Sequence, residues 1–96
     1  MVPRPKPSLD PRIADEAPTV PELTNYDYEL LICYLRLLDA EADGADWRDV
    51  VRLVLKADPD RDYIRARRRY ETHLARARWM TEHGYRHLLT EADDEW

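Results

Sequence analysis

The chain has 96 residues, 44% of them hydrophobic and 36% charged, which is enough for one small domain with a single core and excludes a second domain. Its formal net charge is −5, whereas proteins that bind DNA usually present a net basic surface. The single cysteine, Cys33, excludes an intramolecular disulfide, and no stretch approaches the roughly 20 apolar residues of a membrane span, so we expect a soluble cytoplasmic protein.

The first 21 residues contain six of the seven prolines and few large apolar side chains. Proline fixes φ and lacks a backbone N–H, so regular structure is disfavoured in this segment. We predict an extended or disordered N-terminal arm over residues 1–21, one domain over residues 22–90, and an acidic, frayed tail over residues 91–96.

A first helix is predicted to start near Asn25, because Thr24 followed by Asp27 matches a helix-capping pattern. Apolar residues then recur at helical spacing until Gly44, where a polar turn ends the pattern. We expect Cys33 to be a small buried side chain of this helix. The predicted inward stripe comprises Tyr28, Leu31, Ile32, Leu35 and Leu38, widened by Leu30, Tyr34 and Leu37.

A second, shorter helix of roughly ten residues is predicted after Asp46, which is placed to cap it together with Asp49. The turn over residues 58–60 contains Pro59 and stops the helix, and Asp60 is predicted to cap the helix that follows. The predicted inward face comprises Trp47, Val50, Val51, Val54 and Leu55.

A third helix is predicted from about Arg61 to Glu82, and it carries most of the positive charge. Residues 61–86 hold eight basic and three acidic residues, whereas residues 22–60 hold four basic and ten acidic ones. One side of this helix is predicted to face the core through Tyr63, Ala66, Tyr70, His73, Leu74, Ala77 and Met80. The opposite side, which we call the arginine face, comprises Arg61, Arg65, Arg68, Arg69 and Arg76, with Trp79 at its edge.

The order of a long helix, a short helix, a tight turn and a basic helix predicts an all-α, helix-turn-helix-like (homeodomain-like) bundle. Three main helices are expected, with a short C-terminal fourth helix around Tyr85, Leu88 and Leu89. In such a layout the arginine face either contacts DNA, binds a protein partner, or is simply a solvated charged surface. The acidic residues elsewhere in the chain favour a protein partner over DNA.

Catalytic and metal sites are not predicted. His83 and His87 have the spacing of a helical ligand pair, but Gly84 separates them and no third ligand is evident. No nucleophile–base set, phosphate-binding loop or cofactor motif is present, so we expect neither an enzyme nor a cofactor. His73 is expected at the edge of the core and Trp47 within it, whereas Trp79 is either an exposed anchor for a partner or partly packed on the fourth helix.

Three segments resemble a known family: YLRLLDAEADGADW at 34–47, HLARARWM at 73–80 and GYRHLL at 84–89. They are similar to a small proteobacterial domain, a helix-turn-helix variant, that is shared by QseM, FseA and RovC. The resemblance covers about residues 23–90. It implies a regulator of conjugative-element transfer or of a secretion system.

The resemblance also implies a mode of action. Some members of that family activate transcription, whereas short, free-standing members of the QseM kind are antiactivators that disable FseA-like and TraR-like activators, the latter in quorum sensing. Because this chain is short and acidic, we expect an antiactivator that represses transfer of an integrative and conjugative element. The alternative is a DNA-binding transcriptional regulator that uses the arginine face, and a monomer is favoured while a homodimer stays open.

Overall fold

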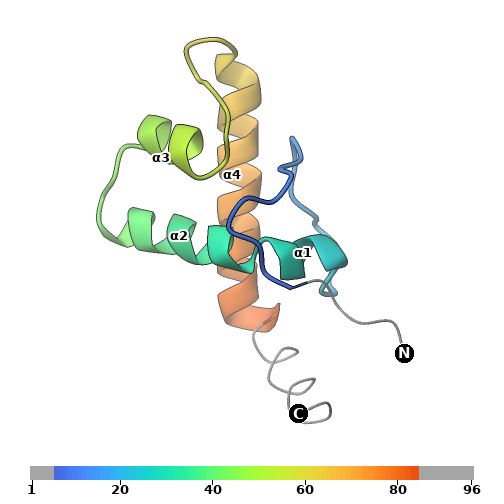
Figure 1. Cartoon of the computed structure of the whole chain (residues 1–96). Helices are drawn as coiled ribbons and strands as arrows, with labels where there is room; N and C mark the ends of the chain where they lie inside the picture. Colours follow the sequence, from blue (N-terminus) through green and yellow to red (C-terminus); the bar gives the residue numbers. More distant parts are fainter. Residues whose placement is uncertain (1–5, 85–96) are drawn as a thin grey trace.

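The computed structural model describes residues 6–84, and all regular structure within that range is helical (Figure 1). The elements are α1 (Asn25–Glu29), α2 (Leu31–Ala42), α3 (Trp47–Leu53), α4 (Tyr63–Trp79) and a π-helical turn, η1 (Met80–Gly84). The predicted all-α fold class is therefore confirmed. The predicted fourth helix and the acidic tail lie outside the described residues.

The long helix α4 contacts most of the other helices of the fold. Figure 1 shows α3 above α2; α2 runs across α4, α3 lies beside it, and both helices contact α4. This is the expected helix-turn-helix-like order, except that α3 and α4 are joined by residues 54–62, which is longer than the tight turn that we predicted. No helix within residues 6–84 is long and apolar enough to cross a membrane.

The core forms where α2 and α3 meet α4. The predicted inward faces of the second and third helices are mostly confirmed, although Tyr63 is 53% exposed. In the first helix the predicted stripe is wrong in part, because Leu35 is 62% exposed and the residues expected only to widen the stripe are the most deeply buried. The buried core comprises Leu30, Cys33, Tyr34, Leu37, Val50, Val51, Leu55, Ala66, Leu74, Ala77 and Met80.

The prediction of a single first helix is also wrong, because the helix breaks at Leu30, whose φ and ψ are −95° and 9°. Tyr28 and Leu30 are two residues apart and would point in nearly opposite directions, about 200° apart, on a straight helix. Both are buried in the structure. The break thus allows both side chains to leave solvent.

Most of the predicted helix caps are present in the structure. Thr24 and Asp27 form the predicted capping box, and Asp46 caps α3. Gly44 has a φ of 73° and completes a Schellman motif, in which its own N–H and that of Ala45 bind the carbonyls of Glu41 and Ala40.

Three helix ends differ from the prediction. Asp62, not Asp60, caps α4, which therefore begins at Tyr63; the Asp60 carboxylate instead accepts a hydrogen bond from Arg52 at 2.7 Å. The α-helical part of α4 ends at Trp79 instead of Glu82, since the last turn is π-helical. Helix α3 has 7 residues, shorter than the ten or so expected.

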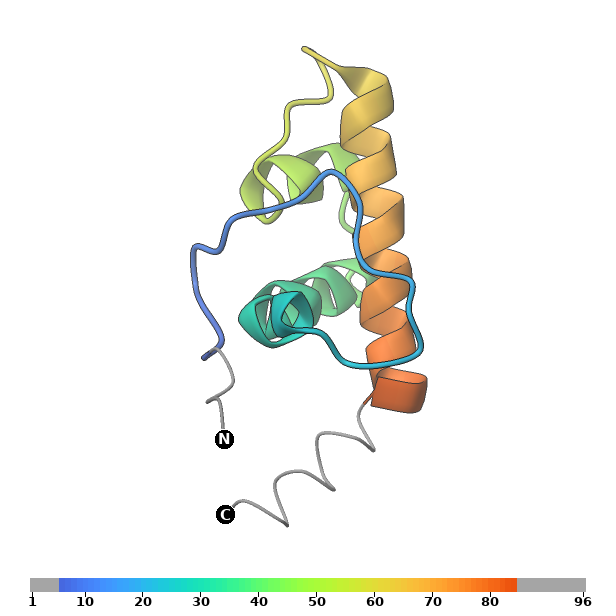
Figure 2. The same ribbon diagram turned by 90° about the vertical axis from the view of Figure 1, so that its right-hand side faces the viewer.

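The arm is extended over residues 6–21 and lies against the helices. Figure 2 shows it passing over α4 and then turning beneath it into α1. Ser8 N–H donates to the Glu29 carbonyl at 3.0 Å, and Ala17 N–H donates to Thr72 Oγ1 at 3.1 Å. Ala17 is buried and Ile13 packs against the core. The predicted extended form is thus observed, with contacts to the core that the sequence did not predict.

Candidate functional site

The predicted arginine face is divided between two environments. Arg65, Arg68 and Arg69 follow i, i+3, i+4 spacing on α4 and meet the arm, and we call these three the arm-covered arginines. Arg61 precedes α4 and is exposed. Arg76 lies elsewhere and is only 3% exposed, so its predicted place on an exposed face is wrong.

Asp15 of the arm bridges two of the arm-covered arginines. Its carboxylate accepts hydrogen bonds from Arg65 at 2.8 and 2.9 Å and from Arg69 at 2.8 Å. The hydrogen bonds from Arg65 and then from Arg69 hold the pKa of Asp15 well below its usual value, and the Asp15 bond raises the pKa of Arg65. Glu16 lies 3.5 Å from Arg68. The arm therefore neutralises this surface with its own two carboxylates.

A hollow of about 560 Å³ lies beside these pairs, between the α3–α4 connection and the first turns of α4. Within it, the Arg69 Nη1 donates to the Leu55 carbonyl at 2.9 Å, which fixes the guanidinium at the floor. The Arg69 Nε is buried and has no hydrogen-bond partner within residues 6–84. The lining residues are Lys56, Ala57, Asp58, Arg61, Asp62, Arg65, Ala66 and Arg69. Four cationic side chains thus line this space, and Asp15 pairs with two of them, Arg65 and Arg69.

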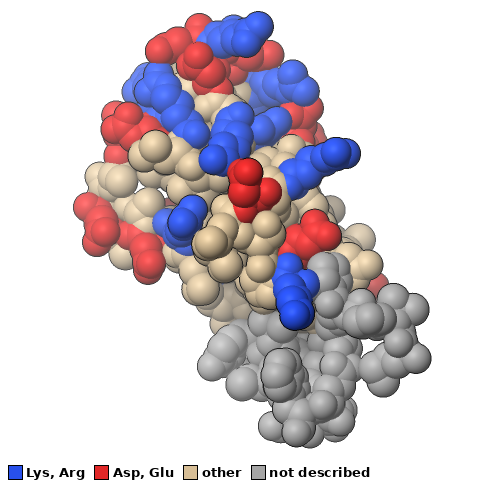
Figure 3. Space-filling model, viewed as in Figure 1, with Lys and Arg blue, Asp and Glu red and all other residues tan. Residues whose placement is uncertain are grey.

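Acidic side chains are interspersed with the basic ones over the visible surface (Figure 3). Each of the six arginines of α4 forms an ion pair with a carboxylate of this chain. The remaining pairs of α4 are Arg67 with Glu71 and Arg78 with Glu41, besides the buried pair of Arg76. No arginine of this helix is therefore available without competition from an internal acid.

Arg76 fastens the arm and α1 to α4 from inside. It binds Asp27 through Nε and Nη2 at 3.0 and 2.7 Å, and it donates to the backbone carbonyls of Val20 and Glu22 at 2.6 and 2.7 Å. Asp27 has no exposed surface. Burial opposes the charge of Asp27, but the hydrogen bonds from Arg76, Thr24 and Tyr34 outweigh it and lower the pKa of that carboxyl. This arrangement is structural.

Trp79 is not the fully exposed partner-binding residue that was one of the two predictions for it. The Arg76 guanidinium carbon lies 4.0 Å from the centre of its ring, and His83 stacks on it with ring centres 6.0 Å apart. The indole is half-buried. Its expected packing on a fourth helix lies outside the described residues, as does His87. Within residues 6–84 no three His, Cys, Asp or Glu side chains gather as a metal site.

His73 is fully buried, so its predicted position at the core edge is wrong. Its Nδ1 lies 2.7 Å from the Arg69 carbonyl, and its Nε2 lies 2.6 Å from the Tyr26 hydroxyl. Because a carbonyl can only accept, Nδ1 carries a proton and donates to Arg69; in the neutral imidazole that burial favours, Nε2 then accepts from the Tyr26 hydroxyl, which itself accepts from the Ala14 N–H at 3.0 Å. Burial is the main cause of the lowered pKa of His73.

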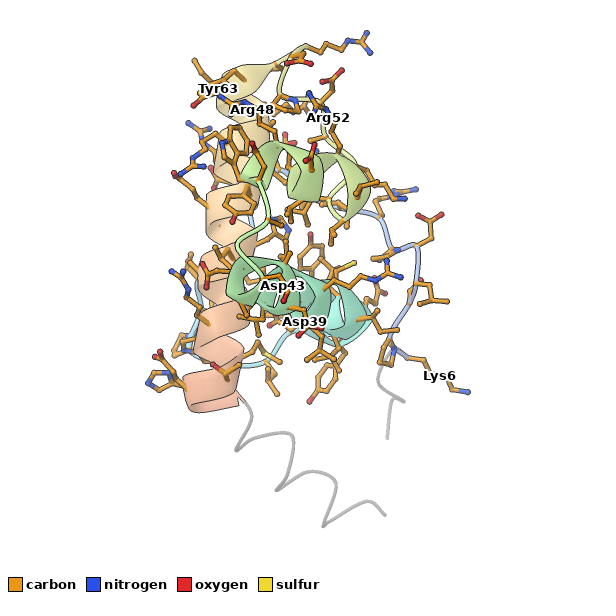
Figure 4. All side chains as sticks on the ribbon, turned by 90° about the vertical axis from the view of Figure 1, so that its left-hand side faces the viewer. Lys6, Asp39, Asp43, Arg48, Arg52 and Tyr63 are labelled. Atoms are coloured by element: carbon orange, nitrogen blue, oxygen red, sulfur yellow. The ribbon has the colours of Figure 1, made fainter. Side chains whose placement is uncertain are left out.

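A second hollow, of about 620 Å³, lies on the other side of α4 between α2 and α3. Its wall contains Trp47, which is half-buried, and Tyr70. The ring centres of these two residues lie 5.9 Å apart. Trp47 also packs edge-on against Tyr63, which Figure 4 shows at the start of α4. Arg67 lies 4.8 Å from the Trp47 ring centre. The predicted core role of Trp47 is therefore only partly met.

The sequence missed the arm as part of this site. A signal was present, since the adjacent acids Asp15 and Glu16 are opposite in charge to the arm-covered arginines. A contact between residues about 50 positions apart, however, has no local pattern that would reveal it.

Comparison with known proteins identifies a family. A family model described as the DNA-binding domain of a type VI secretion system (T6SS) transcription factor, of the RovC kind, matches residues 4–90. That range includes the acidic arm residues as well as all the described helices. No curated protein matches the chain.

Proposed function

The chain belongs to the RovC-like family of type VI secretion transcription-factor DNA-binding domains, and from this premise we propose that it regulates transcription in the cytoplasm as an antiactivator, by binding an activator protein. The observation that supports protein binding over DNA binding is the internal neutralisation of α4. Every arginine of that helix already faces a carboxylate of the chain.

DNA binding relies on arginines and lysines that replace the counterions of the phosphate backbone. On α4 this would require the loss of the Asp15 and Glu16 contacts, and the net charge of −5 adds repulsion at longer range. A protein partner meets less of an obstacle, because its own carboxylates can take the places of Asp15 and Glu16, and charges of both signs can complement the mixed surface seen in Figure 3.

The resemblance described above suggests the finer part of the proposal. The partner would be an FseA-like or TraR-like activator, and the outcome would be repression of transfer of an integrative and conjugative element. Capture would prevent the activator from recruiting polymerase or from binding its own promoter.

The second candidate is direct DNA binding through the exposed part of the arginine face, and the family match favours it. Three of the arginines, Arg61, Arg65 and Arg68, are exposed and lie at the solvent side of α4 and its approach. If each contacts one phosphate, the logarithm of the affinity should fall with the logarithm of salt concentration with a slope of about −2.7.

A titration of the purified full chain against random and promoter duplexes at low salt separates the two candidates. We expect that the wild type binds neither duplex, even at low salt. Binding whose affinity falls with salt concentration at a logarithmic slope of about −2.7 would favour DNA recognition and contradict our proposal.

The positive test is repression of an activator-driven reporter together with direct binding of the purified activator. Repression should weaken in a variant with Arg65→Ala and Arg68→Ala, and should persist after Arg48→Ala, an exposed arginine on α3 that serves as control. Absence of both repression and binding for every FseA-like and TraR-like activator tested would contradict the antiactivator proposal.

A further inference from the structure

We infer that the arm-covered arginines are a docking site for an acidic, extended segment of a protein partner, and that residues 13–17 of the arm occupy this site in the free chain. The inference rests on the proposed function in one respect only, that the partner is a protein. Beyond the proposed function, it identifies the surface that binds the partner and the acidic character of the bound segment. It also implies that residues 13–17 compete with the partner for that surface.

The arm itself shows how such a segment is held. Its backbone is fixed by two N–H donors, that of Ala14 to Tyr26 and that of Ala17 to Thr72. Between these points the Asp15 carboxylate lies between Arg65 and Arg69, and Glu16 faces Arg68. The site therefore selects two adjacent carboxylates on extended chain, followed by a small residue, since Ala17 is 6% exposed.

The side-chain contacts of the arm are suited to exchange. The Arg65–Asp15 and Arg68–Glu16 pairs are open to water, with every side chain at least 46% exposed. Exposed pairs of this kind contribute little net stability, so a partner carboxylate can replace them at small cost. The third pair joins Asp15 to Arg69, which is only 12% exposed, so the carboxylate that replaces Asp15 must also bind Arg69. The next stretch of the arm is different, because Arg76 holds the carbonyls of Val20 and Glu22 from a buried position. A partner segment that makes the same core and backbone contacts as Ile13, Ala14 and Ala17 can therefore replace residues 13–17, while the arm stays attached at residues 20–22.

The hollow provides room for more negative charge than the arm brings. Asp15 pairs with two of its lining residues, Arg65 and Arg69, whereas Lys56 and Arg61 line it without contact to Asp15. Lys56 reaches only the exposed Asp10 at 3.7 Å, and Arg61 has no ion pair with a carboxylate within residues 6–84. A partner with a further acidic residue would thus gain contacts that the arm does not make. Asp58 and Asp62 line the same hollow and disfavour the regular phosphates of a duplex.

The test uses a labelled peptide with the sequence of residues 9–20 as probe, added to the full-length chain. In a variant with Asp15→Asn and Glu16→Gln the internal competitor is weakened, so the peptide should bind at least about ten-fold more tightly than to the wild type. The control variant, Asp39→Asn with Asp43→Asn, removes the same charge from exposed positions of α2 and its cap and should bind like the wild type. Figure 4 shows Asp39 on α2 and Asp43 at its end, both away from the α3–α4 connection.

Two further comparisons make the result specific. A peptide with Asn in place of Asp15 and Gln in place of Glu16 should bind none of the proteins. Adding Arg65→Ala and Arg68→Ala to the arm variant should abolish binding of the acidic peptide, while circular dichroism confirms that the helices persist, because both side chains are exposed. Equal binding to the arm variant and the control variant would overturn the inference. Tighter binding of a random duplex than of the peptide by the arm variant would overturn it in favour of nucleic acid.

The inference and the proposed function fail in different ways. If the peptide binds as expected but no activator is captured, the docking site stands and the antiactivator proposal fails. If an activator binds the wild type and the Arg65→Ala, Arg68→Ala variant equally well, the antiactivator proposal stands and this docking site is wrong.

Discussion

Replacing Arg76 by Met tests the internal fastening of the arm and α1 to α4. The guanidinium is 3% exposed, its partner Asp27 is fully buried, and the side chain also satisfies the carbonyls of Val20 and Glu22. Methionine keeps much of the length and the apolar stem of arginine but none of its donors. The Asp27 charge then stays buried with only Thr24 and Tyr34 as partners.

The expected loss is large for a domain of this size. Removing one partner of a buried ion pair costs about 3–5 kcal/mol. A chain of 96 residues has a free energy of unfolding of about 5–14 kcal/mol, at roughly 0.05–0.15 kcal/mol per residue. The substitution should therefore remove about a fifth or more of the stability and lower Tm by at least about 12 °C, at roughly 4 °C per kcal/mol.

Urea unfolding followed by circular dichroism measures the loss, and Arg78→Met is the matched control. Arg78 is on the same helix, but its pair with Glu41 is exposed, so its loss should cost no more than about 1 kcal/mol. If Arg76→Met costs no more than Arg78→Met, the buried pair does not stabilise the fold and the reasoning is refuted.

Three further results are expected. Because burial keeps the pKa of His73 below its ordinary 6.5, the unfolded chain binds a proton that the folded chain does not, so stability should fall as pH drops below about 6.5. His73→Gln should reduce that slope in urea midpoints measured between about pH 7.5 and 5.5, and an unchanged slope would contradict the assignment. Burial also raises the pKa of Cys33, which is 1% exposed, so a thiol reagent should label it only after denaturation; rapid labelling of the native protein would show an opening that the fold does not contain. Gly44→Ala should cost about 1 kcal/mol in thermal unfolding through its positive φ alone, since no atom lies within 4 Å of the added carbon, and a loss above about 3 kcal/mol would indicate a clash.

The sequence predicted well wherever structure depends on neighbouring residues. The capping box at Thr24, the Asp46 cap and the Gly44 turn each follow from chemistry within four residues, and all three are present. The periodicity of α4 predicted its core face for the same reason. The break at Leu30 was not predictable, because it depends on which neighbours are available to bury Tyr28 and Leu30 together.

The candidate site was predicted only in outline. Helical spacing brought Arg65, Arg68 and Arg69 together correctly. It also placed Arg76 with them, since a charged residue at that position is normally solvated; only the buried Asp27 accounts for its location. The covering of the face by Asp15 depends on a contact across most of the chain, for which periodicity carries no information.

The hydrogen bond from Arg76 to the Val20 carbonyl affects where the independently folding unit begins. A fragment starting at Glu22 would keep every helix, yet it would lose that acceptor, the Ala14 donor of the Tyr26–His73 pair and the buried methyl group of Ala17. A buried guanidinium without one of its acceptors is costly. The smallest independently stable unit therefore includes a stretch of chain with no regular structure, and the helices alone are an incomplete domain.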